Sequence, residues 1–171
     1  ARSLRNQIEL IVSSGDATGK KGEVITLHAA DGKAAIIGMG KESERNEKTC
    51  RDAGAKFVGQ YKKRHGVEFT IRFFGWSEAE MAAFAEGMIL RDYKYDKYKS
   101  KGEDGEEDVS LKAILQCEES SVKALGKLVS TAAAVATGVH LARDLGNCPP
   151  NDLFPMAYAH NAVEWAKGKE N

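Results

Sequence analysis

The first 148 residues of this chain contain no proline, and all three prolines lie between Pro149 and Pro155. Proline lacks a backbone N–H donor and restricts the residue before it, so this cluster must interrupt regular structure. We expect a long helix to end there, a rigid connector to follow, and a new helix to begin near Pro155. An interruption of this kind indicates a domain boundary, and it predicts that the chain is the N-terminal part of a larger protein.

Cysteine is also sparse. Cys50, Cys117 and Cys148 are far apart in the sequence, so there is no CxxC pair and no zinc-ligand spacing. A low and odd cysteine count favours a reducing compartment. The N-terminus is polar and charged, unlike a signal peptide, and the most apolar stretch, residues 131–139, is too short to span a bilayer. These features predict a cytoplasmic protein with no membrane partner.

Excess charge of either sign is missing as well, because 25 lysines and arginines balance 25 aspartates and glutamates. A net charge of zero gives no general reason to expect binding to nucleic acid or to a membrane surface. With 171 residues, 42% of them apolar, the chain can form one domain, or one domain plus a connector. A domain of this size needs neither disulfides nor a metal to fold.

Motifs for catalysis are absent too. His28, His65, His140 and His160 are scattered, and no HExxH pair or Asp/Glu/His cluster has metal-ligand spacing. No GxSxG pattern occurs, and nothing around Cys148 marks its thiol as reactive. By spacing alone the chain has no active site, and we assign no catalytic, cofactor-binding or metal-binding residue.

Two glycine-bearing loops resemble phosphate-binding loops only weakly. A P-loop has four residues between its glycines and a serine or threonine after the lysine, whereas residues 15–20 have three and Lys21 follows. The segment Gly38-Met-Gly40-Lys41 stands between a strand and a helix, where backbone amides can bind anions, but the third glycine of a dinucleotide fingerprint is missing. We interpret both as turns.

A basic run, Arg91 to Lys101, carries Tyr93, Tyr95 and Tyr98. Lysines interleaved with aromatic side chains can bind single-stranded nucleic acid. The acidic residues at 103–108 would offset that positive field, so we favour a solvated helix end followed by a solvated loop over residues 101–108. Nucleic acid is therefore not expected as a partner.

Alternating helical and strand patterns make up the rest of the chain. Helices are predicted at Ser3–Ser14, from a cap at Ser43 through Tyr61 to a stop at Gly66, from the capping box Ser77–Glu80 onward, and from Ser120 or Ser121 to about Leu145. Strands are predicted at 22–29, 34–40, 67–74 and 110–117, with a hairpin turn at 30–33. This order predicts an α/β fold with a mixed sheet flanked by helices.

Three of these helices carry an apolar stripe that should face the core. The stripes are Cys50, Ala53, Phe57, Val58 and Tyr61; Met81, Phe84, Ala85 and Met88; and Val122, Leu125, Val129, Ala132, Ala136, Val139 and Ala142.

Two segments resemble the leucyl aminopeptidase (cytosol aminopeptidase) family. Residues 86–100, EGMILRDYKYDKYKS, are similar to the family's "EG…L…Y.FD.YKS" segment, and residues 138–155, GVHLARDLGNCPPNDLFP, are similar to "NLARDLVNEPPN.LTP". The chain departs from the second pattern at Gly146, Cys148 and Phe154, where an aliphatic residue, an acidic residue and threonine are common. The family's domain also usually opens with a strand, and none precedes Ser3.

The resemblance implies a division of the chain. Residues 1–119 would be a macrodomain-like N-terminal domain, 120–147 an interdomain helix, and 148–171 a connector and the start of a catalytic domain. In the family that catalytic domain holds two divalent metals, zinc, manganese or magnesium, in motifs such as "KG.TFDSGG" and "NTDAEGR". Neither motif occurs here, so no family site residue can be assigned to this chain.

The resemblance therefore implies the assembly or regulatory domain of a metallo-aminopeptidase. The parent enzyme would be a cytosolic hexamer that removes N-terminal residues, leucine preferred, from peptides, and this segment alone would be inactive. The alternative is a stand-alone macrodomain-like module that binds a nucleotide or DNA without peptidase activity. Zero net charge weighs against DNA, because affinity for phosphates requires clustered cations.

Overall fold

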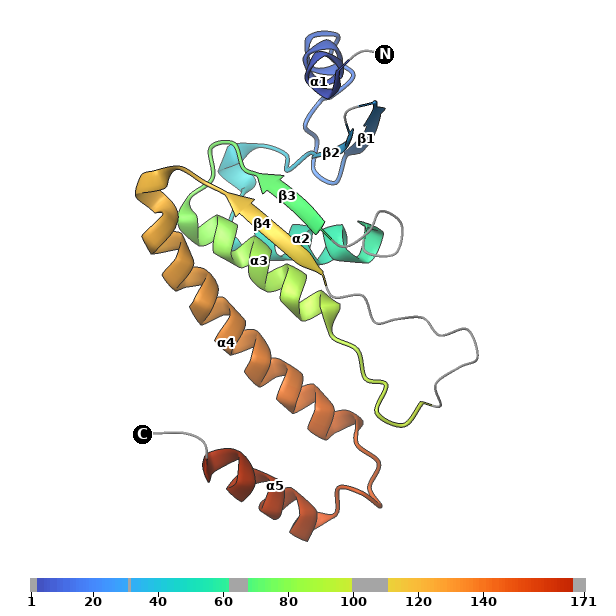
Figure 1. The fold of residues 1–171 in the computed structure, drawn as a ribbon, viewed down its shortest axis with the longest axis vertical. Helices are drawn as coiled ribbons and strands as arrows, with labels where there is room; N and C mark the ends of the chain where they lie inside the picture. Colours follow the sequence, from blue (N-terminus) through green and yellow to red (C-terminus); the bar gives the residue numbers. More distant parts are fainter. Residues whose placement is uncertain (1–2, 31, 62–67, 100–110, 168–171) are drawn as a thin grey trace.

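The computed structural model describes residues 3–30, 32–61, 68–99 and 111–167 (Figure 1). Its elements are α1 Leu4–Ser13, β1 Val24–Ala29, β2 Gly32–Ile37, η1 Glu42–Glu44, α2 Glu47–Tyr61, β3 Glu68–Arg72, α3 Glu78–Asp92, β4 Lys112–Gln116, η2 Glu119–Ser121, α4 Val122–Asn147 and α5 Pro155–Lys167. The predicted mixture of helices and strands is confirmed. His65, the helix stop at Gly66 and the acidic loop 101–108 lie outside the described residues.

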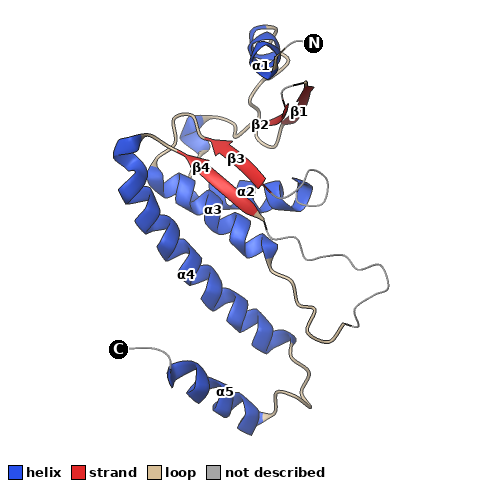
Figure 2. Ribbon diagram, in the orientation of Figure 1, coloured by secondary structure: helices blue, strands red, loops and turns tan. Residues whose placement is uncertain are grey.

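The strands form two separate sheets. β1 pairs with β2 in antiparallel fashion, from Val24 opposite Ile37 to Ala29 opposite Gly32. β3 pairs with β4 in parallel, and the connection between them contains α3, as a parallel pair requires. Figure 2 shows the two pairs as separate units. The prediction of one mixed sheet was therefore wrong for the described residues, because the hairpin pairs only with itself.

Local capping signals decide where the helices begin. Ser3 caps α1 by accepting a hydrogen bond from the Asn6 amide at 3.4 Å, as predicted. At α3 the predicted capping box is present: Ser77 Oγ accepts from the Glu80 amide at 3.3 Å, and Glu80 Oε2 accepts from the Ser77 amide at 2.8 Å.

The start of α2 differs from the prediction. Ser43 lies within η1, and Asn46 occupies the capping position instead. Asn46 Oδ1 accepts from the Thr49 amide, and Thr49 Oγ1 accepts from the Asn46 amide, both at 3.0 Å. Asparagine caps helices at least as well as serine, and this reciprocal pair satisfies two amide donors at once.

The main core lies between α2, α3 and the inner face of β3. Its buried members are Phe57, Val58, Tyr61, Phe84 and Met88. Phe69 and Ile71 of β3 pack against them, while Glu68, Thr70 and Arg72 on the other face are exposed. The predicted stripes of α2 and α3 and the predicted alternation of β3 are confirmed.

α4 lies along α3 over most of its length (Figure 1). Leu125 and Ala136 are its buried residues, and the predicted stripe is half-buried at Val129, Ala132 and Val139. Val122 and Ala142 at the two ends of that stripe are exposed, contrary to prediction. Ala142 is exposed because it lies about 120° around the helix from the buried Ala136, and Val122 is the first residue of α4. α5 begins at Pro155, as predicted.

Candidate functional site

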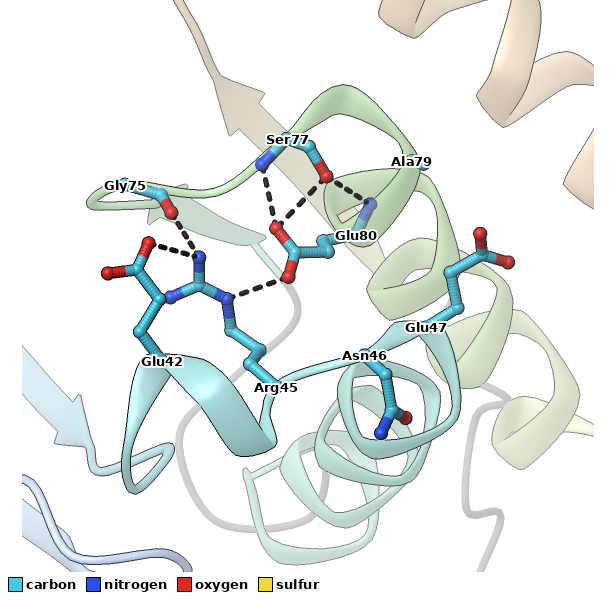
Figure 3. A pocket seen from close by; sticks show the side chains of 8 residues that line it. All are labelled: Glu42, Arg45, Asn46, Glu47, Gly75, Ser77, Ala79 and Glu80. Atoms are coloured by element: carbon cyan, nitrogen blue, oxygen red, sulfur yellow. Dashed lines mark hydrogen bonds and ion pairs between the residues drawn. The ribbon is translucent and has the colours of Figure 1, made fainter.

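The first candidate is a cleft of about 500 Å³ where α2 and α3 begin (Figure 3). Its lining residues are Glu42, Arg45, Asn46, Glu47, Gly75, Ser77, Ala79 and Glu80. Two helix N-termini and one arginine could together attract an anion. Whether they do depends on which of their donors are already used.

The guanidinium of Arg45 has three partners within the protein. It lies 2.8 Å from Glu80 Oε1 and 3.5 Å from Glu42, and it donates to the Gly75 carbonyl. It also stacks 5.5 Å from the Trp76 ring centroid. Burial raises the pKa of Glu80, but hydrogen bonds from Arg45 and Ser77 outweigh that effect and leave the pKa lowered. The cleft is therefore a joint between η1 and α3, in which Arg45 and the amides of Asn46, Ser77 and Glu80 already have partners within the protein.

The loop at residues 15–20 also uses its donors internally. Glu23 accepts hydrogen bonds from the Gly19 amide at 2.6 Å and from Thr18 Oγ1 at 3.0 Å. A carboxylate thus occupies the place where a phosphate would have to bind. The same holds for the second glycine segment, where the amides of Gly38 and Gly40 bond to the carbonyls of Glu23 and Gly19 at 2.8 Å. Both loops are turns, as interpreted from the sequence.

The described histidines lie apart from one another. His28 is exposed on β1, His160 is exposed on α5, and His140 packs against Tyr93. Among the described residues no three His, Cys, Asp or Glu side chains come close enough to hold a metal ion. Cys50 is fully buried, and burial raises the pKa of its thiol to about 11, so that thiol stays protonated at neutral pH.

The second candidate is the place where the two family-like segments meet. Tyr93, directly after α3, donates a hydrogen bond to Asp144 Oδ1 of α4 at 2.9 Å and accepts one from Asn147 Nδ2 at 3.2 Å. The Tyr93 ring lies 5.1 Å from the His140 ring. Residues about 50 positions apart in the sequence therefore form one contact, which we call the α3–α4 junction.

Arg143 strengthens the junction from the α4 side. Its guanidinium donates to the Leu90 carbonyl at 2.9 Å, in the last turn of α3, and lies 5.4 Å from the Tyr93 ring centroid. A cation at this point satisfies an open carbonyl and complements the negative end of the α3 dipole. The end of α3 is thereby fixed against the last turns of α4.

Tyr98 extends the junction to the proline connector. Its hydroxyl lies 3.4 Å from Cys148 Sγ, and a hydrogen bond to Asp152 raises the pKa of Tyr98 well above its ordinary value. Burial, followed by the hydrogen bond to Asp144, also raises the pKa of Tyr93. Both hydroxyls therefore remain neutral donors at physiological pH. This chemistry suits a structural joint rather than proton transfer.

The sequence analysis missed this role for the tyrosines. Lys94, Lys97 and Lys99 are exposed, as expected for a solvated helix end, but Tyr93 and Tyr95 are half-buried. The sequence did carry one signal, a tyrosine every two or three residues among the lysines. Tyrosines in such a position can be partly buried, and a buried tyrosine hydroxyl usually has a hydrogen-bond partner. Nothing in the spacing indicated that the partners lie in residues 143–152.

Comparison with known proteins identifies the family. The profile described as "Cytosol aminopeptidase family, N-terminal domain" matches residues 1–102. The probable cytosol aminopeptidase of Alkaliphilus oremlandii (strain OhILAs) is 33% identical over 165 residues, which cover 91% of this chain and 33% of the relative. That of Azotobacter vinelandii (strain DJ / ATCC BAA-1303) is 29% identical, over 90% of this chain and 32% of the relative.

Solved structures agree with this result. A tomato leucine aminopeptidase mutant, K354E, has a TM-score of 0.72 at 21% identity and covers 96% of this chain and 33% of its own. The bottromycin maturation enzyme BotP has a TM-score of 0.67 at 26% identity, over 98% of this chain and 35% of its own.

The chain thus belongs to the cytosol aminopeptidase family and comprises its N-terminal domain. It spans about a third of the length of the curated relatives it matches. The curated relatives that match it are named as probable cytosol aminopeptidases.

One segment also meets the length and composition of a membrane span. Residues Glu119–Asn147 form a 29-residue helical segment with a mean hydropathy of 1.3 in its most apolar window. The apolar run at 131–139 therefore belongs to a longer segment than the sequence analysis allowed for. Such a single helix is weak evidence for a membrane location, and here it packs against α3.

Proposed function

We propose that this chain is the non-catalytic, assembly or regulatory domain of a metallo-aminopeptidase that removes N-terminal residues, leucine preferred, from peptides. The observation that carries the proposal is the α3–α4 junction. It joins the two segments that resemble the family and fixes the direction in which the chain leaves the α/β domain. A joint of this kind suits a domain that must hold a fixed orientation relative to whatever follows it.

The divisions of the chain belong to the same proposal. Residues 1–119 would form a macrodomain-like domain, 120–147 an interdomain helix, and 148–171 the connector to a catalytic domain. The helix bounds and the proline connector of the structure are compatible with this division. A cytoplasmic hexamer is proposed for the full-length enzyme.

Two divalent metals, zinc, manganese or magnesium, are proposed for the parent enzyme. One matching structure is titled as the bottromycin maturation enzyme BotP in complex with Mn. The described residues of this chain do not fit such a centre, because no three potential ligands among them lie together. The metal site and its catalytic residues are therefore proposed to lie in the part of the relatives that this chain does not span.

The proposal is tested by comparing the peptidase activity of the 171-residue chain with that of the full-length protein. The purified 171-residue chain should release no p-nitroaniline from leucine p-nitroanilide in zinc, manganese or magnesium, whereas the full-length protein should do so. Metal-dependent release by the 171-residue chain would overturn the proposal. So would an inactive full-length protein that binds a nucleotide or DNA.

A further inference from the structure

His140 takes part in the α3–α4 junction with one ring nitrogen unused. Its side chain is half-buried on α4, and its ring centroid lies 5.1 Å from that of Tyr93. The Nε2 atom is buried and has no hydrogen-bond partner among the described residues. Buried polar atoms in native proteins nearly always have a partner, so this exception requires an explanation.

Two charged side chains of α4 lie on the same side of the helix as His140. Arg143 and Asp144 follow it by three and four residues, and side chains at these spacings are neighbours on a helix surface. Both already contact the end of α3: Asp144 Oδ1 accepts from the Tyr93 hydroxyl at 2.9 Å, and Arg143 donates to the Leu90 carbonyl at 2.9 Å. A positive charge on His140 would therefore meet one cation and one carboxylate that is in use.

The α3 side contributes two charged neighbours of Tyr93. Asp92 and Lys94 flank it in the sequence, and each takes part in other interactions. Glu86 and Arg91, the other charged side chains in the second half of α3, contact α2 instead. Asp144 is thus the carboxylate that helix spacing brings within reach of His140.

Protonation of the imidazole changes what the closed junction must accommodate. A neutral imidazole carries a proton on only one nitrogen, whereas in the imidazolium both nitrogens are donors. A buried donor without an acceptor destabilises a fold, and a charged one does so more strongly. Asp144 can supply the acceptor only by moving away from the Tyr93 hydroxyl, which it binds now.

We propose that the α3–α4 junction is a pH-sensitive switch, in which protonation of His140 releases the end of α3 from the last turns of α4. In the closed junction a proton on Nε2 has no acceptor unless Asp144 leaves Tyr93, whereas in the open junction water accepts it. The open form therefore binds the proton more tightly, and the free energy of opening falls as the pH falls. Histidine ordinarily changes its charge between pH 5 and pH 8, so the switch operates in that range.

The consequence for an enzyme rests on the function proposed above. The junction fixes the direction in which the chain leaves the α/β domain, so acidification would free that direction and allow the two parts of the enzyme to move relative to each other. The switch itself requires only residues of this chain, and it is tested without any peptidase activity.

Amide hydrogen exchange of the 171-residue chain, corrected for the pH dependence of the intrinsic exchange rate, measures the opening. The protection factors of residues 143–147 should fall about fivefold between pH 7.5 and pH 5, while those in α2 stay unchanged. The ion pair of Glu80 does not interfere in this range, because the pKa of that carboxyl is lowered from its ordinary value of 4.5.

Three variants assign the effect to His140. His140→Phe keeps an aromatic ring against Tyr93 but cannot be protonated, so its protection factors should be the same at pH 7.5 and pH 5. His140→Gln also removes the titrating group and serves if the phenyl ring is not accommodated. The matched control is His160→Phe, which replaces an exposed histidine of α5 and should keep the pH dependence of the wild type. Circular dichroism verifies that each variant folds.

The results decide between three arrangements at Nε2. Loss of the pH dependence in the His140 variants, with its retention in His160→Phe, supports the proposal. Wild-type protection that is constant with pH overturns it, and indicates that an internal water accepts the proton. Protection that rises at pH 5 overturns it too, by showing that Asp144 accepts from Tyr93 and His140 together, and so does equal pH dependence in all variants. None of these outcomes depends on leucine p-nitroanilide hydrolysis, so this proposal and the proposed function can fail separately.

Discussion

α3 contacts a helix on each of two sides, and the two contacts are built differently. Against α2 the backbones touch: a Cβ at Gly54 would overlap the Phe84 carbonyl, and one at Gly87 would overlap the Arg51 carbonyl. The contact with α4 contains no such glycine among the described residues: Gly126, Gly138 and Gly146 of α4 lie away from α3 and have open space around them. The same residue type therefore marks close backbone packing in one pair and a free helix face in the other.

The two contacts also differ in what holds them. The α2–α3 pair encloses the main core, whereas α4 buries only Leu125 and Ala136. Polar contacts fix α4 at both ends instead. Ser121 donates to Glu78 at 2.6 Å near the start of the two helices, and the α3–α4 junction holds their far end. Substitutions should therefore destabilise the whole domain at the first contact and act locally at the second.

The largest effect is expected for Gly87→Ala. The new methyl group would overlap the Arg51 carbonyl and lie 3.1 Å from the Ala55 amide nitrogen, so α2 and α3 must separate. Overpacking of this kind should lower the free energy of unfolding by about 3 kcal/mol. The matched control is Gly126→Ala, which should raise it by about 0.5–1 kcal/mol through helix propensity alone. Urea denaturation followed by circular dichroism measures both, and equal effects would show that the contrast between the two contacts is wrong.

The second largest effect on stability is expected at the ion pair that joins η1 to α3. Arg45 and Glu80 are only 12% and 16% exposed, so Arg45→Met leaves a largely buried carboxylate without its partner and should cost about 2 kcal/mol. The pKa of Glu80 is lower in the folded protein than in the unfolded chain. Its contribution to the free energy of unfolding is therefore complete above the unfolded pKa near 4.5 and is lost as the pH falls through the folded pKa.

A pH series checks that assignment. Between pH 6 and pH 3 the stability of the wild type should decline, and Glu80→Gln should flatten part of the decline. Glu9→Gln is the matched control, because Glu9 pairs with Arg5 in an exposed position on α1. If Glu80→Gln and Glu9→Gln follow the same curve, the buried pair does not contribute as proposed.

The parts of the fold that the sequence predicted are those set by nearby residues. Ser77 and Glu80 are three positions apart and cap one helix, and Phe57 and Tyr61 share a face because they are four apart. The cap of α2 was misplaced for an equally local reason: Asn46 with Thr49 competes successfully with Ser43.

Errors arose where distant segments meet. The strand patterns did not show that, within the described residues, β1 and β2 would pair only with each other, since alternation defines a strand but not its neighbour. The α3–α4 junction was missed because Tyr93 and Asp144 are 51 residues apart, although both lie in segments that the resemblance had picked out.

The smallest effect is expected at that junction, from Tyr93→Phe. Loss of the hydroxyl removes the hydrogen bonds with Asp144 and Asn147 but keeps the ring against His140. The cost should be about 1 kcal/mol, and because α4 is held locally it should appear as local opening. Amide hydrogen exchange near residues 143–147 should accelerate about fivefold, while exchange in α2 stays unchanged. Tyr158→Phe, an exposed tyrosine of α5, is the matched control and should change neither. Uniform acceleration across α2 and α4 would mean that the junction supports the whole domain, and that the two contacts of α3 are less independent than the glycines indicate.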